Sequence, residues 1–104
     1  MTILSVYAIF ADADEAERIG RLVVEERLAA CVNILGPVRS IYRWHGKVEQ
    51  ANEVAATFKT SEAGAQALIE RIAALHSYEV PCVVASPVAA VLDSYGAWVE
   101  ASVG

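Results

Sequence analysis

The chain has 104 residues, which suits a single compact domain spanning residues 1–104. Its hydrophobic fraction of 56% exceeds the roughly 45–50% usual for soluble domains, so some apolar surface must be covered by more than the chain's own core. The net charge of −5 repels phosphate backbones and anionic lipid, and the longest uncharged stretch, 80–92, falls short of the roughly 20 residues of a membrane span. We therefore expect neither a nucleic acid nor a membrane as a partner.

The first part of the chain predicts a strand, a helix and a second strand. Residues 2–10 are rich in β-branched and aromatic side chains, as in a strand covered by neighbours. Asp12 followed by Glu15 forms a capping-box pattern, with apolar residues at helical spacing behind it, which predicts a helix over 12–28. A β pattern returns over 31–44, bent at a Gly-Pro pair in its middle.

The second part predicts a return strand, a helix, a short strand and a last helix. A glycine turn leads into 48–59, where apolar and polar residues alternate. Ser61 or Thr60 is placed to cap a helix whose apolar residues recur at i, i+3, i+4 and i+7. Residues 81–88 resemble a short buried strand fenced by prolines, and Asp93 is placed to cap the last helix.

This order predicts an α+β, ferredoxin-like β-α-β-β-α-β sandwich with a long hairpin between the second and third strands and a C-terminal helix. About 12 residues per hairpin arm, at roughly 3.3 Å each, span about 40 Å. A compact chain of this length has a radius of gyration of only about 13 Å. We expect the hairpin to extend beyond its own domain, and a closed homo-oligomer to cover its strand edges and apolar side chains.

The two cysteines and the N-terminal stretch bear on the compartment. Cys31 and Cys82 form no CxxC pair and lie in apolar, strand-like runs, which is typical of reduced and buried thiols. The first ten residues carry no cationic flank ahead of an apolar block, as a secretory signal would. We expect a cytoplasmic protein.

One short segment carries donors of the kinds that bind metals. His76, Glu79 and Cys82 span seven residues and offer an imidazole, a carboxylate and a thiolate, a set that can hold copper or zinc if the loop brings the three together. In the alternative interpretation His76 caps the preceding helix and its neighbours fix the loop. We expect no required cofactor, and weak binding of Cu(II) or another divalent cation.

A second candidate site surrounds the hairpin. Tyr42, Trp44 and Lys47 at the turn can either line a ligand cleft between subunits or form a packed tip with Trp44 as an interface anchor. Glu53 and Lys59 share one side of the return arm and, with Tyr78, can form a polar intersubunit pocket. The alternative for these charges is a solvated strand face.

Four segments give the chain a resemblance to a known family. VEERLAACVNIL (24–35), SIYRWHGKVE (40–49), FKTSE (58–62) and LHSYEVP (75–81) occur in the order and spacing of the CutA family, the divalent-cation tolerance proteins. The match covers nearly the whole chain. It implies a ferredoxin-like protomer, a homotrimer built through the long hairpin, and an association with tolerance to copper and other divalent metals.

The chain also departs from that family's pattern. Members typically read His-Pro-Tyr-Glu-x-Pro-Glu at the last motif, where this chain has Ser77 for the first proline and Cys82 for the final glutamate. Members proposed to bind copper carry a cysteine and a second histidine where this chain has Phe10 and Leu75.

Other functional classes have weaker support. The sequence contains no Walker loop, GxSxG elbow or HExxH motif, and the turn after the first strand is ADAD, which would repel the phosphate of an acyl phosphate. We therefore expect no enzyme. The main rival to metal tolerance is a small-molecule sensor, because the trimeric PII signalling proteins, which share the fold, hold small effectors in a similar intersubunit cleft.

Overall fold

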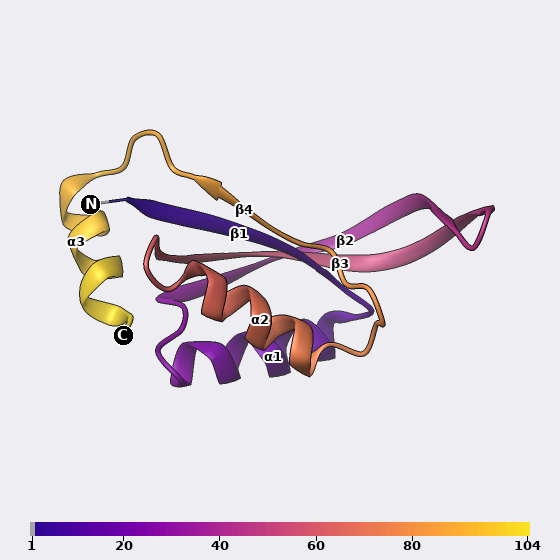
Figure 1. Ribbon diagram of the computed structural model, residues 1–104, viewed down its shortest axis with the longest axis horizontal. Helices are drawn as coiled ribbons and strands as arrows, with labels where there is room; N and C mark the ends of the chain where they lie inside the picture. The colour runs from indigo at the N-terminus through magenta and orange to yellow at the C-terminus, as the bar shows by residue number, and fades with distance from the viewer. Residues whose placement is uncertain (1) are drawn as a thin grey trace.

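The protein is a two-layer α+β domain, shown in Figure 1 as a computed structural model that describes residues 2–104. Two helices cover one face of a four-stranded sheet, and a third helix lies at one end of it. The elements in chain order are β1 (Ile3–Phe10), α1 (Ala13–Glu25), β2 (Cys31–Trp44), β3 (Lys47–Ser61), α2 (Ala65–Leu75), β4 (Val83–Pro87) and α3 (Asp93–Ser102).

The sheet is antiparallel with the strand order β2-β3-β1-β4. Each of the two crossovers, through α1 and α2, returns the chain to the same sheet, and both helices lie on one face as right-handed connections require. This confirms the predicted ferredoxin-like topology. It also leaves β2 and β4 as the outer strands of the described sheet, each with one edge not paired within the chain.

The main core lies between α1, α2 and the sheet. Phe10 and Phe58 pack with their ring centroids 6.3 Å apart, and apolar residues from both helices cover them. A smaller cluster beneath α3 joins Ile3, Ala30 and Val99. The fully buried helix residues of the main core are Ala16, Ile19, Val23, Leu68 and Ile72, which are the helical stripes of the sequence.

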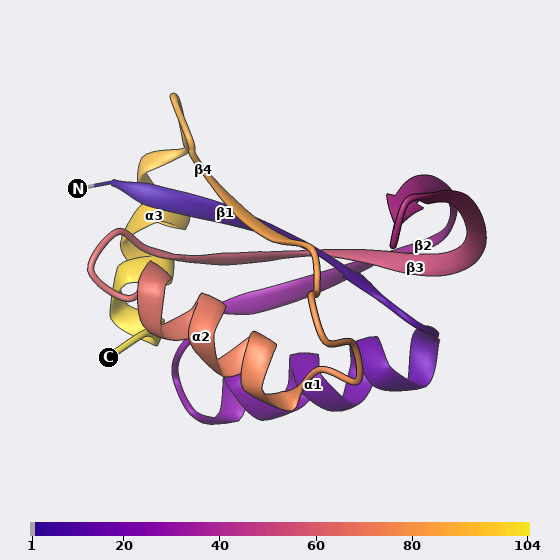
Figure 2. The same cartoon turned by 45° about the vertical axis from the view of Figure 1, so that its right-hand side comes forward.

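The hairpin of β2 and β3 extends beyond the rest of the sheet. β1 stops pairing with β3 at Phe10↔Val54, whereas β2 and β3 remain paired as far as Trp44↔Lys47. Figures 1 and 2 show this segment projecting from the domain and curling over, and the longest extent of the molecule is 44 Å. The predicted overreach of the hairpin is confirmed.

Two backbone features shape that hairpin. The register shifts between Ile34 and Gly36, which leaves Leu35 as a bulge and lets Gly36 adopt a φ of 111°. At the tip His45 and Gly46 both have positive φ, 49° and 78°, as in a two-residue type I′ turn.

The helix boundaries differ from the sequence prediction in three places. α1 stops at Glu25 because Arg27 adopts a left-handed φ of 63° and the chain turns back. α2 begins at Ala65 without a side-chain cap, since Thr60 and Ser61 still belong to β3. Asp93 is the first residue of α3, and no side chain caps that helix. The predicted cap at Asp12 is confirmed, because its carboxylate accepts the Glu15 backbone N–H at 2.8 Å.

Two burial predictions fail in the protomer. β4 is shorter than predicted and mostly exposed, because it pairs with β1 on one edge only and the helices shield it little. Cys82 is likewise exposed, and Cys31 is half-buried with its thiol 3.4 Å from the Tyr95 hydroxyl. No helix in residues 2–104 combines the length and the apolar character needed to cross a membrane.

Candidate ligand cleft

A cleft of about 540 Å³ lies between the hairpin and the loop that connects α2 to β4. β2 and β3 form one wall, and the loop after α2 forms the other. That volume falls within the range of about 300–1,000 Å³ that is typical of small-molecule sites. The lining residues are Ile9, Ser40, Tyr42, Arg43, Trp44, Glu53, Tyr78, Glu79, Val80 and Cys82.

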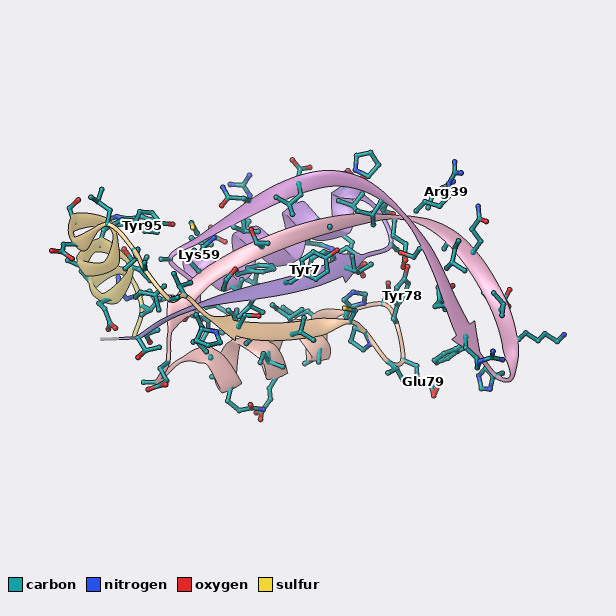
Figure 3. All side chains as sticks on the ribbon, turned by 90° about the horizontal axis from the view of Figure 1, so that it is seen from above. Tyr7, Arg39, Lys59, Tyr78, Glu79 and Tyr95 are labelled. Carbon is teal, nitrogen blue, oxygen red and sulfur yellow. The ribbon has the colours of Figure 1, made fainter. Side chains whose placement is uncertain are left out.

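The cleft brings together four of the six side chains predicted to form it. Tyr42, Trp44, Glu53 and Tyr78 all line it, although they come from three separate segments. Lys47 lies at the hairpin turn and Lys59 lies six residues beyond Glu53 on β3, which is about 20 Å along an extended strand. Figure 3 shows Lys59 on the side of Tyr95, far from Tyr78 and Glu79, so Lys59 does not belong to this cleft.

The Glu53 carboxylate and the Tyr78 hydroxyl form the polar centre of the cleft. The Tyr78 hydroxyl donates to Glu53 Oε2 at 2.6 Å. Burial and this bond to a carboxylate raise the pKa of Tyr78 well above its usual value of 10.0, so the phenol keeps its proton and serves as a donor. Glu53 is only 7% exposed, which disagrees with the alternative stated from the sequence, a solvated strand face. Strand parity could not reveal this, because the covering residue comes from the loop after α2.

His76 is buried at the end of α2, behind the cleft, and both of its ring nitrogens have backbone partners. Nδ1 accepts the Tyr78 N–H at 3.0 Å, so the ring proton resides on Nε2 and is donated to the Ile9 carbonyl at 2.7 Å. The ring also stacks on Phe10 with centroids 5.2 Å apart. His76 therefore ties the loop to β1, whereas the alternative stated from the sequence had His76 cap the helix and its neighbours fix the loop.

Glu15 contributes to the same loop, a role that the sequence did not reveal. Its carboxylate accepts the Ala11 N–H at 3.0 Å and, from across the molecule, the Ser77 N–H at 2.9 Å. Burial by itself would raise the pKa of Glu15, but these bonds and the nearby His76 outweigh it and hold the pKa below its ordinary value of 4.5. The capping-box pattern was the one available signal, and it indicated a bond from the N–H of Asp12, one residue after the Ala11 N–H that Glu15 accepts.

The predicted metal donors are not assembled into one site. Within residues 2–104 no three His, Cys, Asp or Glu side chains come together as a metal-binding group. The free lone pair of His76 is occupied by the Tyr78 N–H, while Glu79 and Cys82 lie in the wall of the cleft. Partial burial and the charge of Glu53 raise the pKa of the Cys82 thiol, which disfavours the thiolate that a metal prefers.

The fold and the cleft define a ferredoxin-like protein with a projecting β-hairpin and a ligand-sized cleft beside it. The CutA1 divalent ion tolerance protein family matches residues 4–102. The chain therefore belongs to the CutA1 family of divalent ion tolerance proteins.

Individual proteins agree with this assignment. The chain is 42% identical over 100 residues to the divalent-cation tolerance protein CutA of Thermus thermophilus, covering 95% of this chain and 97% of that protein. It is 45% identical over 85 residues to mouse protein CutA, covering 82% of this chain but only about half of that protein, 48%. The structure of a CutA from Archaeoglobus fulgidus, described as a periplasmic divalent cation tolerance protein, superposes with a TM-score of 0.94 at 35% identity, covering 98% of this chain and 99% of that one.

Proposed function

We propose that this protein acts by binding, not by catalysis, and that it holds a small ligand in the cleft beside its hairpin. The observation that carries this proposal is the cleft itself, in which an aromatic wall from β2 faces the buried Glu53–Tyr78 pair. Polar groups fixed inside a largely apolar concavity are the usual design of a small-molecule site. This favours the sensor interpretation over a dedicated metal site.

We propose further that the protein is a homotrimer. The projecting hairpin exposes large apolar side chains, among them Ile41 at 69% and Val48 at 64%, and soluble proteins cover such surfaces. The outer edges of β2 and β4 offer unpaired backbone to a second copy, and a head-to-tail contact of this kind closes into a ring. In such a trimer the open side of the cleft would face a neighbouring copy.

Multi-angle light scattering tests the assembly. We expect a mass of about three times 11.1 kDa that persists on dilution to micromolar concentration. We also expect the trimer to resist added salt, which screens charges but leaves apolar burial intact. A monomer at micromolar concentration would refute the trimer.

Copper is the second candidate ligand, supported by the family's role in divalent-cation tolerance and by Glu79 and Cys82 in one cleft wall. We expect weak binding of Cu(II) that is selective over Mg²⁺, because copper heads the affinity order for nitrogen and sulfur donors. Calorimetric titration should show this binding reduced by Cys82→Ser. His76→Ala should act mainly by loosening the loop, because both ring nitrogens of His76 already have partners. Tight stoichiometric binding indifferent to Cys82→Ser would show that the donors lie elsewhere.

We propose the cytoplasm as the compartment, on the basis of two free cysteines. The Archaeoglobus relative is described as periplasmic, so cell fractionation with antibodies against the protein is the direct test.

A ligand screen on the pure trimer tests the central proposal. Thermal shift across a metabolite and amine collection should identify compounds that stabilise the protein by several degrees. Tyr42→Ala should abolish those shifts, because Tyr42 lines the cleft, whereas the same change at Tyr95 in α3 should leave them unaltered. Hits that survive Tyr42→Ala would place the ligand outside the cleft.

A further inference from the structure

The cleft contains a buried carboxylate without a cationic partner. Glu53 is 7% exposed, its Oε2 accepts the Tyr78 hydroxyl, and within residues 2–104 no ion pair reaches it and no hydrogen bond reaches its Oε1. In that same part of the chain every fully buried side-chain nitrogen and oxygen has a hydrogen bond. Oε1 must therefore keep some accessible surface, and because Glu53 lines the cleft, that oxygen opens into it.

A carboxylate in this position is costly unless a positive group meets it. Moving an ionised carboxylate out of water carries a penalty of several kcal/mol, which a single hydroxyl donor offsets only in part. The Tyr78 phenol keeps its proton beside Glu53, because burial and the hydrogen bond to this carboxylate raise the pKa of Tyr78. The protomer thus presents a buried negative charge with one acceptor oxygen still free.

The remaining charges of the cleft do not neutralise Glu53. Glu79 adds a second carboxylate to the wall, and the Cys82 thiol stays neutral at physiological pH because its pKa is raised. Arg43 is the one cation among the lining residues of the described chain, and it forms no ion pair with either carboxylate.

The other walls suit an organic cation better than a bare metal ion. Tyr42, Trp44 and Tyr78 bring three aromatic rings to the cleft, and the faces of such rings attract ammonium groups. Ile9 and Val80 complete a largely apolar lining. A volume of about 540 Å³ is also far larger than one ion requires.

We propose that the cleft selects a protonated organic amine with a small apolar body. This inference rests on the proposed function, because it names the chemical class of the ligand that the cleft would hold. The ammonium N–H donates to Glu53 Oε1, and the apolar body lies against Tyr42 and Trp44. An N–H donor strengthens binding because the free oxygen of Glu53 is a hydrogen-bond acceptor.

Three probes of similar size but different charge test the proposal by isothermal titration of the intact protein at pH 7. They are 2-phenylethylamine, neutral 2-phenylethanol and the anion 3-phenylpropanoate. We expect the amine to bind at least about tenfold more tightly than the alcohol, and the anion to show no binding, because one charge-assisted hydrogen bond to a buried carboxylate supports such a difference. Benzyltrimethylammonium, which lacks N–H donors, should fall between the amine and the alcohol.

A pair of matched variants locates the effect. Glu53→Gln keeps the shape of the side chain and an oxygen for Tyr78 but removes the charge, so the preference for the amine over the alcohol should fall below about twofold. Glu62→Gln removes an exposed carboxylate from the turn just after β3 and should leave the preference unchanged. If Glu53→Gln fails to fold, Tyr42→Leu is the substitute, and it should weaken amine binding by about three- to tenfold through loss of the ring.

The outcomes separate this inference from the proposed function. Equal binding of the amine and the alcohol at a Tyr42-dependent site would overturn the amine preference and leave a ligand-binding cleft. Failure of all probes to bind would also overturn it, and the metabolite screen would then decide whether the cleft holds any ligand. Binding of Mg²⁺ or Cu²⁺ that depends on Glu53, with no amine binding, would assign the carboxylate to a metal.

Discussion

Strand β3 passes through two different environments, and its two halves show how this molecule divides. Between Val54 and Lys59 it lies between β1 and β2, with α1 and α2 over one face, and most of its side chains are buried or nearly so. Between Lys47 and Gln50 it pairs with β2 alone, and every side chain is exposed. Val48 in the outer half is as apolar as Val54 in the inner half, yet only the inner one is shielded.

The difference lies in neighbours and not in residue type. The inner half of the hairpin belongs to a core that the protomer completes by itself, whereas the outer half carries apolar side chains with nothing from the same chain to cover them. The cleft sits where the two halves meet, with one wall on the projecting β2 and the other on the loop held by Glu15 and His76. Stability should therefore depend on the inner half, and assembly on the outer half.

The largest expected effect is that of Phe58→Ala in the inner half. Phe58 is fully buried against Phe10, so its loss should lower the free energy of unfolding by about 3–5 kcal/mol. Urea unfolding followed by circular dichroism at several protein concentrations measures this. Val48→Ala is the matched change in the outer half. The part of its loss in unfolding free energy that does not depend on protein concentration should not exceed about 0.5 kcal/mol. Equal effects at the two positions would contradict the inference that stability depends on the inner half of the hairpin and assembly on the outer half.

Trp44→Ala tests the outer half. Trp44 is 38% exposed at the hairpin tip. If it anchors the interface, the substitution should weaken assembly by about 2–4 kcal/mol, while the circular dichroism spectrum of the protomer stays recognisable. The melting temperature of the variant should fall further on dilution than that of the parent, which differential scanning fluorimetry over a hundredfold concentration range would show. A variant that melts like the parent at every concentration would remove Trp44 from the interface.

Glu15→Gln tests the link between the core and the cleft wall. An amide cannot accept both the Ala11 and the Ser77 N–H through its single oxygen, so about 1–3 kcal/mol of stability should be lost at pH 7. Because the pKa of Glu15 is depressed in the folded state, its contribution is complete above 4.5 and disappears as the pH falls through the lower folded value. Acid titration should show the parent losing this increment below pH 4.5, and the variant losing less. Parallel acid curves for the two proteins would count against the role of Glu15.

Gly46→Ala at the hairpin turn should have the smallest effect. Gly46 has a φ of 78°, a conformation that costs an alanine about 1 kcal/mol. Gly46→Asn should cost less, because asparagine tolerates this region better. Thermal melts of both variants beside the parent provide the comparison, and an alanine variant at least as stable as the parent would mean that the turn relaxes freely.

The order of elements followed from the sequence because its signals are local. Alternation along 48–59, helical spacing behind Asp12 and a glycine at the turn each report the conformation of a few neighbouring residues. The helix boundaries differ from the prediction where one residue departs from the helical pattern. Arg27, for example, adopts a left-handed backbone conformation just after the end of α1. Such a departure in a non-glycine residue has no strong signature in a single sequence.

The candidate site was predictable only in part. The aromatic cluster of Tyr42 and Trp44 was visible because its members are adjacent in the chain, and Tyr78 was included because the loop after α2 emerges near β3 in this fold. Lys59 was misplaced because sharing one side of a strand says nothing about distance along it. His76 was a candidate metal donor until the structure showed both of its ring nitrogens bonded to backbone groups.

By itself, the sequence determined the α+β class, the ferredoxin-like order, the overlong hairpin and the surplus of apolar surface, since periodicity, arm length and composition are properties of the chain. The tertiary structure alone decided which polar groups are available for chemistry. Glu53 is buried because Tyr78, twenty-five positions away, covers it, and the ring N–H of His76 is bonded to the Ile9 carbonyl of β1. Whether a side chain is exposed, paired or free depends on segments distant in sequence, and local sequence patterns do not predict which of those segments will pack against it.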